Sequence, residues 1–131
     1  MISLKIVTPR GRYLEKKVKS IHLTSVEGEM TVLVNHMPIF ASILPCELVL
    51  VDESDTRLKY ALSGGFFHLE KNEAMLLTDA IEGKGDIDIE RAKRAYRRAR
   101  DRIDKKDSAT NMKRANLALV RAMNRIHVHD D

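Results

Sequence analysis

The chain as far as about residue 81 carries apolar side chains in short runs that alternate with polar ones. Apolar runs of this length, bounded by turn signals, are typical of β-strands. The runs occupy residues 2–6, 18–23, 30–34, 48–51, 58–62, 66–69 and 75–78. Clusters rich in Gly, Pro, Asn and Asp separate them and predict turns. Because no helical pattern is available to connect parallel neighbours, the sequence predicts an antiparallel sandwich or barrel.

The spacing of the apolar residues becomes helical after Gly83, Lys84 and Gly85. Two sets of residues then recur at intervals of three and four, which is the period of an amphipathic helix. The first set is Ala92, Ala95, Tyr96, Ala99 and Ile103, and the second is Met112, Ala115, Leu119, Ala122, Met123 and Ile126. The short connection between them predicts an antiparallel hairpin of two helices. We therefore expect a β-sandwich domain over residues 1–85 and a helical hairpin over residues 86–131.

Residues that can cap the two helices precede each apolar set. A side-chain oxygen at the N-cap accepts a hydrogen bond from a free backbone N–H of the first turn. Asp86 or Asp88 is the candidate for the first helix, and Asp107, Ser108 or Thr110 is the candidate for the second. The expected contact seam is rich in alanine, whose small side chain buries little apolar area. We expect a hairpin that is weakly held and able to unfold or swing away.

Charge divides the chain at nearly the same position. Residues 1–86 hold 10 Lys and Arg against 12 Asp and Glu, a net charge of −2. Residues 87–131 hold 13 against 7, a net charge of +6. The C-terminal part is therefore attracted to an anionic partner, whether phosphate, nucleic acid or an acidic protein surface.

Few residues suit catalysis or metal binding. Cys46 is the only cysteine, so no intramolecular disulfide and no cysteine-based zinc site can form, and its expected role is that of a small strand residue. His127 and His129 have a spacing that can hold a metal, but we expect them to belong to a frayed tail. The sequence contains no G-x-x-x-x-G-K-[ST] loop and no nucleophile elbow. We expect no catalytic residue, no metal and no enzyme activity.

The N-terminal residues bear on where the protein resides. The segment MISLKIVTPRGRYLEKK lacks the apolar core of a signal peptide, and no apolar run approaches the roughly 20 residues that span a bilayer. We expect the protein to remain in the compartment where it is made, a reducing interior.

Four segments, in order along nearly the whole chain, carry a resemblance to a known family. They are LKIVTPRGRYLEKKV, VEGEMTVLVNHMPIFASI, SGG followed by FFHLEKNEAMLLTDAIE, and DIDIERAKRAYRRA. In this combination the chain resembles the epsilon subunit of bacterial F-type ATP synthases. It departs where Gly-Glu-Leu-Gly-Ile-Leu-Pro-Gly-His is usual in the family, because residues 28–36 read Gly-Glu-Met-Thr-Val-Leu-Val-Asn-His. Asn35 can still adopt the left-handed backbone conformation that glycine provides.

The resemblance implies a fold and a set of partners. The fold is a β-sandwich of about ten strands followed by the helical hairpin. The sandwich binds the gamma subunit and the ring of membrane c subunits, so that it turns with the rotor of a proton- or cation-translocating synthase. The extended hairpin reaches the catalytic alpha/beta head and inhibits ATP hydrolysis. The subunit is then peripheral at the cytoplasmic face of the bacterial cell membrane and touches the membrane only through the complex.

Two residues match the edge that faces the c-ring in this family. They are Glu29 and His36, whose polar groups would meet polar loops of the ring. The alternative is that Glu29 is a solvated turn residue and that His36 helps to close the turn.

A narrower motif lies at the start of the first helix. Residues 87–92 match an I-D-x-x-R-A pattern that, by the resemblance, belongs to an ATP site in certain bacterial epsilon subunits. The positions implied are Glu82, Ile87, Asp88, Arg91, Ala92, Arg98, Arg121 and Arg125. The two arginines of each helix share one face, so the hairpin can bring four guanidinium groups together, and these suit phosphate oxygens. The alternative is that the arginines are exposed residues that keep the helices soluble.

ATP is therefore expected as a regulatory ligand, and no cofactor is required. Asp88 would accept a hydrogen bond from the adenine amino group or a ribose hydroxyl, and Ile87 would pack on the base. Because only the closed hairpin gathers the arginines, ATP would favour the closed state and relieve inhibition.

A nucleic-acid-binding module is the main alternative from another class. A small β-barrel with a basic helical tail would bind phosphate in the same way. Against this alternative, the sandwich is net acidic, and the aromatic residues that would stack on bases are expected mostly in the buried register of the strands. These residues are Tyr13, Phe40, Tyr60, Phe66, Phe67 and Tyr96. We therefore expect no nucleic acid among the partners.

Overall fold

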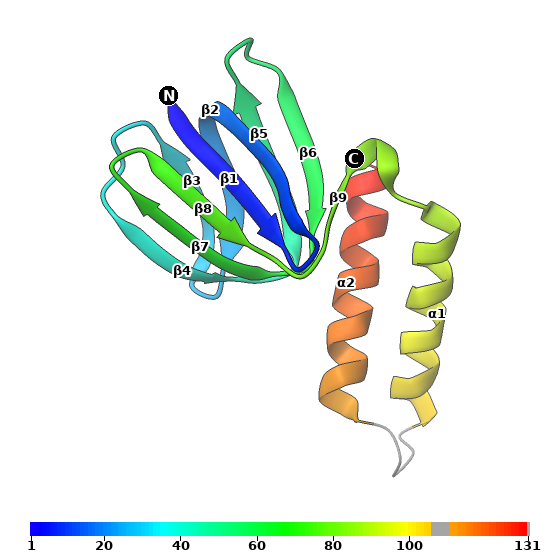
Figure 1. Cartoon of the computed structure of the whole chain (residues 1–131). Helices are drawn as coiled ribbons and strands as arrows, with labels where there is room; N and C mark the ends of the chain where they lie inside the picture. The colour runs from blue at the N-terminus through cyan, green and yellow to red at the C-terminus, as the bar shows by residue number, and fades with distance from the viewer. Residues whose placement is uncertain (106–110, 131) are drawn as a thin grey trace. The chain divides into compact units, whose positions relative to one another are not determined.

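The computed structural model describes residues 1–105 and 111–130, and the chain divides into two units (Figure 1). The first unit, Met1–Gly83, contains the strands, and the second, Lys84–Asp131, contains the helices. The boundary falls where the spacing of the apolar residues changes from that of a strand to that of a helix.

The first unit is a sandwich of nine strands, one fewer than the resemblance implies. The strands are β1 Ile2–Thr8, β2 Gly11–Ser25, β3 Gly28–Leu33, β4 Ile39–Ile43, β5 Cys46–Asp52, β6 Arg57–Leu62, β7 Gly65–Glu70, β8 Glu73–Leu77 and β9 Ile81–Gly83. Side chains alternate between buried and more exposed positions along β7 and β8, as expected for strands that bury one face. The predicted fold class, a β-sandwich followed by a helical hairpin, is confirmed.

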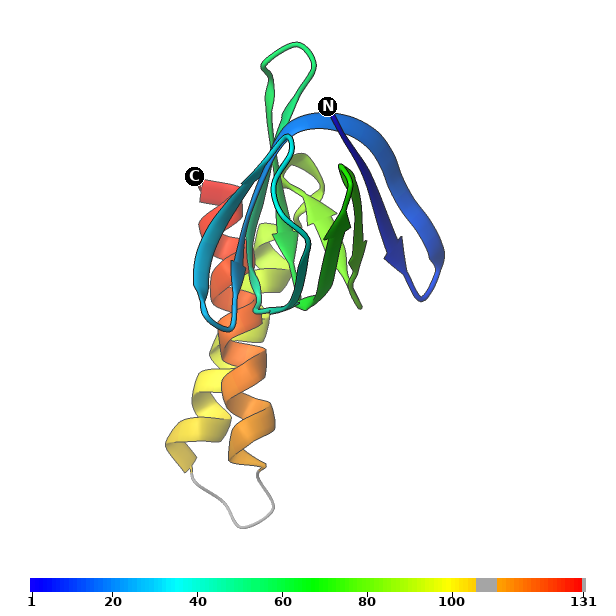
Figure 2. The same ribbon diagram turned by 90° about the vertical axis from the view of Figure 1, so that its left-hand side faces the viewer.

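The longest strand, β2, connects the layers of the sandwich. It spans 15 residues and follows a long curve (Figure 2). Its first half pairs with β1, and its second half pairs with β3 and β5. The strand order is β1-β8-β7-β4-β2-β5-β6-β9, β3 pairs with β2 beside this path, and the pairing of β1 with β2 closes the part from β1 to β2.

One pairing is parallel in an otherwise antiparallel sheet. In β1 and β8, Ser3 lies opposite Glu73 and Val7 lies opposite Leu77, and both strands run in the same direction. Parallel neighbours need a long connection, for which a helix is the usual solution. Here the six strands from β2 to β7 provide the connection, so a helix is not required.

Large apolar side chains fill the space between the layers. The following are at most 1% exposed: Ile2, Leu4, Ile6, Val18, Ile21, Leu23, Leu48, Leu50, Leu62, Phe67, Leu69 and Leu76. Gly65 allows the close approach of β7 to β8, because its φ is 146° and a Cβ there would overlap the carbonyl oxygen of Leu77. Only glycine fits at this position.

The second unit contains a short 3-10 helix, η1 Lys84–Asp86, and two helices, α1 Ile89–Lys105 and α2 Met112–Asp130. Asp88 caps α1, because its Oδ1 accepts a hydrogen bond from the backbone N–H of Arg91 at 3.1 Å. Asn111 caps α2 in the same way, through the N–H of Arg114 at 3.1 Å. The candidate Asp88 is therefore confirmed, whereas Asp107, Ser108 and Thr110 lie outside the described residues.

The two helices run antiparallel and pack along a seam of alanines (Figure 1). Ala92 and Ala99 of α1 are 3% and 2% exposed, and Ala115 and Ala122 of α2 are 3% and 0% exposed. The predicted amphipathic helices with a seam of small residues are confirmed, but the prediction is wrong for Met123, which is 51% exposed. Within the described residues, no helix is both long and apolar enough to cross a membrane.

Candidate functional site

Two arginines of α1 lie next to the alanine seam. Arg91 directly precedes Ala92, and Arg98 directly precedes Ala99. Both arginines are therefore displaced from the seam by one helical step of about 100°, in the same direction. Their side chains are exposed, and two helical turns, about 10 Å, separate them along the axis.

The two arginines of α2 lie on the same side of the seam. Arg121 directly precedes Ala122, and Arg125 follows Ala122 by three residues, so both lie in one direction from it. Because α2 runs opposite to α1, a residue that precedes a seam position projects to the same side in both helices. Both side chains are half-buried. The hairpin therefore presents its four predicted arginines on one side.

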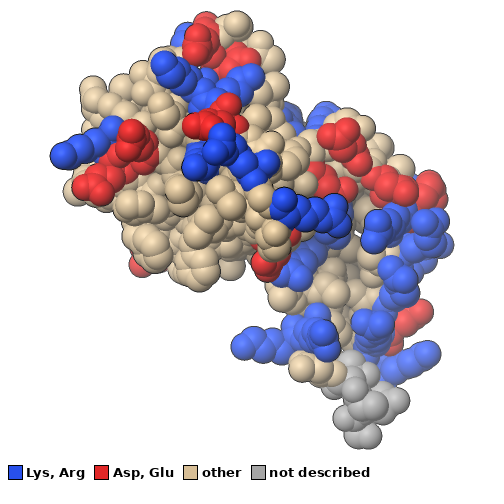
Figure 3. Space-filling model, viewed as in Figure 1, with Lys and Arg blue, Asp and Glu red and all other residues tan. Residues whose placement is uncertain are grey.

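Three of the four arginines have polar groups without a partner among the described residues. Within residues 1–105 and 111–130, no ion pair involves Arg91 or Arg98. In the same part of the chain, the buried Nε of Arg121 has no hydrogen-bond partner. Figure 3 shows that Lys and Arg dominate the visible charge over both helices. Guanidinium groups gathered in this way repel one another, and an anion with several oxygens relieves that repulsion.

The other residues of the predicted ATP site have structural roles of their own. Asp88 uses one carboxylate oxygen to cap α1, and its second oxygen can accept a further bond. Ile87 and Ala92 are buried, at 7% and 3% exposure. Glu82 lies in β9 opposite Ala61 and so belongs to the first unit, whereas the other seven residues belong to the second.

The two residues predicted to face the c-ring lie toward opposite ends of β3. Glu29 is next to the turn between β2 and β3, opposite Thr24, whereas His36 follows the other end of the strand. The strand from Glu29 to Leu33 is about 13 Å long, at roughly 3.3 Å per residue. The structure therefore does not bring Glu29 and His36 together.

Their surroundings also differ. The Glu29 side chain is 76% exposed, and its Oε1 lies 3.9 Å from Nε2 of His22. His36 is half-buried, its backbone N–H donates to the carbonyl of Leu33 at 3.2 Å, and its Nδ1 lies 2.8 Å from the carbonyl oxygen of Met37. His36 thus closes the loop after β3, whereas most of the Glu29 side chain is available to a partner.

An exposed apolar surface covers one layer of the sandwich. Residues that pair across neighbouring strands project to the same side of a sheet. One row consists of Ser42, Phe66, Leu77 and Val7, and the next consists of Phe40, His68, Met75 and Lys5. Phe40, Phe66, Met75 and Leu77 are 74%, 50%, 39% and 45% exposed. We call these four residues the outer apolar face.

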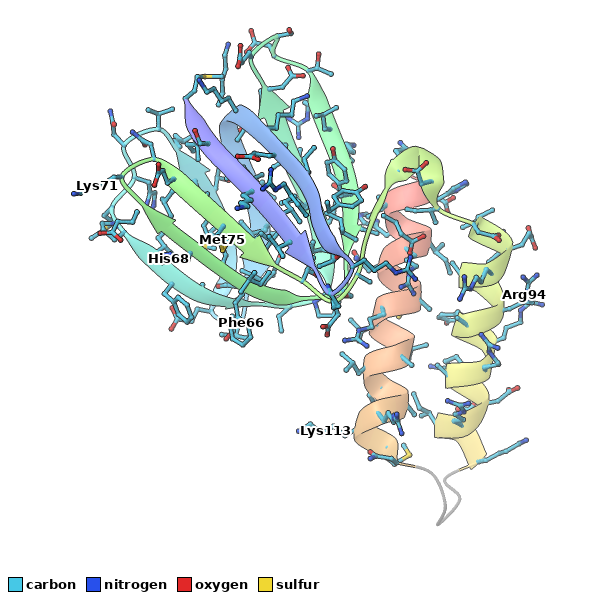
Figure 4. The ribbon with its side chains drawn as sticks, viewed as in Figure 1. Phe66, His68, Lys71, Met75, Arg94 and Lys113 are labelled. Atoms are coloured by element: carbon cyan, nitrogen blue, oxygen red, sulfur yellow. The ribbon has the colours of Figure 1, made fainter. Side chains whose placement is uncertain are left out.

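Aromatic contacts order this face. The rings of Phe40 and Phe66 stack with centroids 6.2 Å apart, and the ring of His68 lies 6.1 Å from that of Phe40. Figure 4 shows Phe66, His68 and Met75 on the outer side of β7 and β8. Figure 3 shows a broad area without charged side chains over the same layer.

The prediction that the aromatic residues lie mostly in the buried register is wrong for Phe40 and Phe66, which are 74% and 50% exposed. Phe67 is fully buried, whereas Phe66 points outward, because only every second residue of a strand can face the core. The order Phe66, Phe67, His68, Leu69 already contains this signal, since Phe67 and Leu69 share one face and Phe66 shares the other with the polar His68.

Cys46 is buried in β5, and its Sγ lies 3.4 Å from the backbone nitrogen of Thr24. Burial raises the pKa of the Cys46 thiol, and the hydrogen bond from Thr24 offsets part of this effect. The thiol therefore remains protonated at neutral pH and is suited to packing rather than to nucleophilic chemistry. Among the residues that the structure describes, no three His, Cys, Asp or Glu side chains are grouped so that they could hold a metal ion.

Comparison with known proteins gives the family. Residues 1–84 match the beta-sandwich domain of the ATP synthase delta/epsilon chain, and residues 86–130 match the long alpha-helix domain of the same chain. The ATP synthase epsilon chain of Clostridium novyi is 37% identical over 95% of each chain. The epsilon chain of Bacillus velezensis is 34% identical over 97% of this chain and 96% of its own.

Solved structures agree with this assignment. A chain of the Euglena gracilis mitochondrial ATP synthase, in a structure of OSCP, F1 and the c-ring, superposes with a TM-score of 0.84 and 26% identity over 94% of this chain and 78% of that chain. A chain of the Tetrahymena thermophila mitochondrial ATP synthase, in a structure of the central stalk and c-ring, superposes with a TM-score of 0.56 over 66% of this chain and 69% of that chain. At 12% identity this second likeness shows the fold alone.

The chain belongs to the delta/epsilon family of ATP synthase subunits. Within that family it is similar to the epsilon chains of bacteria, and it is accordingly a non-catalytic stalk subunit of the enzyme.

Proposed function

We propose that this chain is a rotor subunit in which residues 1–85 bind the gamma subunit and the c-ring, while residues 86–131 regulate ATP hydrolysis. The observation that carries the proposal is the outer apolar face. A contiguous exposed patch of this kind on a small domain marks a protein interface. Family membership supports the choice of partners, because the relatives of this chain are ATP synthase subunits.

The gamma subunit is the partner proposed for the outer apolar face. Burial of apolar surface favours association by about 25 cal/mol per Å². Aromatic anchors such as Phe40 and Phe66 contribute most to interfaces of this type, and few charged groups need to lose water there. The face therefore suits a permanent partner within the rotor better than a transient polar contact.

Binding of the whole chain to an F1 complex that lacks its own epsilon chain tests this proposal. We expect Phe66→Ala to weaken binding by roughly 2 kcal/mol, about 30-fold, because it truncates a central aromatic anchor. Val26→Ala is the control, since Val26 is 61% exposed but lies outside the outer apolar face. Equal binding by the two variants would exclude this face as the gamma interface.

Contact with the c-ring is proposed for Glu29 and, separately, for His36. Because the two residues lie toward opposite ends of β3, a ring loop that contacts one need not contact the other. Glu29→Gln and His36→Gln are therefore compared one at a time, by c-ring recovery with the assembled synthase and by ATP-driven proton pumping. If neither substitution changes either quantity, both roles are excluded.

The hairpin is proposed to bind ATP on the side that carries Arg91, Arg98, Arg121 and Arg125. The absence of an ion pair at Arg91 and Arg98 within residues 1–105 and 111–130, together with the buried Nε of Arg121 that lacks a hydrogen-bond partner there, supports a phosphate ligand. Asp88 and Ile87 would contact the nucleoside. Ala92 and Glu82 are the other two positions that match the ATP-site pattern of the family.

ATP then acts by selecting one state of the hairpin. A ligand shifts an equilibrium only through the difference in its affinity for the two states. Only the closed hairpin holds the arginines of α1 and α2 on one side. A falling ATP concentration therefore releases the hairpin, which extends toward the catalytic head and inhibits hydrolysis.

Calorimetric titration of the whole chain with ATP tests this mechanism. We expect Arg91→Ala to weaken binding by roughly 1.5–3 kcal/mol, the range for a hydrogen bond to a charged group. Arg94→Ala is the matched control, because it also removes a positive charge from α1 but the side chain points away from α2 (Figure 4). Unchanged binding by Arg91→Ala, or no binding by the parent at millimolar ATP, would exclude the ATP site and leave the rotor proposal intact.

The proposed location is the cytoplasmic face of the bacterial cell membrane, where the chain is peripheral and touches the membrane only through the complex. Recovery of the chain with washed membranes, and its release together with F1, would support this location. The nucleic-acid-binding alternative is not favoured, because both units match the ATP synthase family.

A further inference from the structure

Two asparagines connect loops that are far apart in the sequence. The backbone N–H of Asn35 donates to Oδ1 of Asn72 at 2.7 Å, and Nδ2 of Asn72 donates to Oδ1 of Asn35 at 3.0 Å. Asn35 belongs to the loop between β3 and β4, and Asn72 belongs to the turn between β7 and β8. We call this reciprocal pair of hydrogen bonds the amide clamp.

Both asparagines have a left-handed backbone conformation. The angle φ is 66° at Asn35 and 61° at Asn72, and Lys71 beside it has a φ of 50°. Glycine adopts this conformation without steric cost, and a two-residue hairpin turn often has glycine at its second position. The hydrogen bonds of the clamp explain why asparagine, and not glycine, occupies these two positions.

One half of the clamp is anchored in the sheet. The carbonyl oxygen of Asn72 accepts a hydrogen bond from the backbone N–H of Ser3 in β1 at 2.9 Å. The turn that carries Asn72 also joins β7 to β8, and Figure 4 shows Lys71 projecting from it. Asn72 is therefore fixed by three strands.

The other half of the clamp is a loop with exposed apolar side chains. Val34 and Met37 are 40% and 72% exposed, and the chain then continues through Pro38 to Phe40 of the outer apolar face. The clamp joins Asn35 of this loop to a turn that the sheet fixes, in addition to the bond from the His36 N–H to the carbonyl oxygen of Leu33 in β3.

We propose that Asn72 is a positioning residue for the gamma interface, which acts through Asn35 to hold Val34 and Met37, and not the His36 proposed for the c-ring, in the positions that extend the outer apolar face. This inference rests on the proposed function. An ordered loop loses less conformational entropy on binding. Without the clamp the loop samples other shapes. The observed affinity is then the affinity of the binding-competent shape multiplied by the fraction of time that the loop spends in that shape. Asn72 itself need not touch gamma.

Glycine substitutions separate the clamp from the backbone conformation. Asn35→Gly and Asn72→Gly both keep a residue that tolerates a positive φ, but the first removes one of the two hydrogen bonds and the second removes both. We expect Asn72→Gly to weaken binding to F1 without its epsilon chain about tenfold, and Asn35→Gly about threefold. The double variant should lose no more than Asn72→Gly alone, because no bond is left for the second substitution to remove.

Two further variants make the test specific. Asn72→Asp keeps the acceptor for the Asn35 N–H but not the donor, so it should recover part of the affinity. Asp55→Gly is the matched control, because Asp55 has a φ of 62° in the turn between β5 and β6, and we expect it to bind as the parent does. Protection of the Asn35 amide proton from exchange, followed by NMR, should be lost in Asn72→Gly while the melting temperature changes little.

The possible outcomes are distinguishable. Parent-like binding by Asn35→Gly and Asn72→Gly, or additive losses in the double variant, would overturn the clamp proposal. A loss of binding to the isolated c-ring alone would overturn the assignment of the loop to gamma. A parent chain that does not bind F1 would instead overturn the proposed function. If Asn72→Gly does not fold, the binding of Asn35→Gly alone tests the clamp. This variant keeps the hydrogen bond from its backbone N–H to Asn72 and loses only the side-chain bond.

Discussion

The sandwich and the hairpin are stabilised by buried side chains of different size. The core of the sandwich contains Phe67 and many Leu and Ile residues, whereas the seam of the hairpin contains alanines. Burial of a Leu or Phe side chain contributes about 1.5–3 kcal/mol, and a single methyl or methylene group contributes only about 0.8 kcal/mol. A unit that has to keep one shape needs the first kind of interior. An interior of small side chains such as alanine suits a unit that exchanges one set of contacts for another, as the proposed regulation requires.

Removing the hairpin is the largest change that tests this difference. A chain that ends at Asp86 should fold, bind F1 and support coupling, because the strands and their core lie within Met1–Gly83. Regulation of ATP hydrolysis should be lost completely. Circular dichroism and hydrolysis assays of the reconstituted complex measure the two effects. A shortened chain that is unfolded would show that the sandwich depends on the hairpin.

Two neighbouring phenylalanines provide the next test. Phe67→Ala should lower the free energy of unfolding by about 3–5 kcal/mol, because it empties a fully buried position in the core. Phe66→Ala should lower it by less than about 1 kcal/mol, because Phe66 is half exposed, although it should weaken F1 binding. Urea unfolding of both variants gives the comparison. Similar losses of stability would mean that the inner and outer faces of β7 are wrongly assigned.

A larger side chain in the seam should disturb the hairpin alone. Ala122→Leu should cost about 1–3 kcal/mol by overpacking, since Ala122 is 0% exposed. Val120→Leu is the matched control, because Val120 is 45% exposed on the same helix. Hydrogen exchange of α2 and the inhibition of hydrolysis should change for Ala122→Leu, while F1 binding should not. Unchanged inhibition would argue against a mobile hairpin.

The smallest expected effect is at a helix cap. Asn111→Ala should destabilise the start of α2 by about 1 kcal/mol, because it removes the acceptor for the N–H of Arg114. Faster amide exchange in the first turn of α2 is the expected result. Asn111→Asp, which retains the acceptor, should exchange as slowly as the parent, and an equal increase in both variants would exclude the capping role.

The sequence was sufficient to predict structural features that depend on residues close together along the chain. Strands and helices follow from the spacing of apolar residues, and the position of Arg91 beside Ala92 follows from the helical period. The parallel pairing of β1 with β8 could not be predicted in this way. Alternation determines which side of a strand is buried, but it does not determine which strand lies beside it.

The candidate site shows the same division. The four arginines come from two helices with a clear period, so their common side is predictable. The outer apolar face needs the order of β4, β7 and β8 in the sheet, and the amide clamp joins Asn35 to Asn72 across 37 positions of sequence. Asn111 was missed as a cap because the polar segment before α2 contains several residues able to serve.

The pairing of β1 with β8 also determines when the sandwich can close during synthesis. β1 ends at Thr8 and β8 ends at Leu77, so about 70 residues are made after β1 before its second neighbour is complete. At 5–20 residues per second this interval lasts on the order of 4–14 s. Throughout it, the edge of β1 that will pair with β8 has free backbone N–H and C=O groups and can pair with other chains. We therefore expect the yield of folded protein to depend on protection of β1 during this interval.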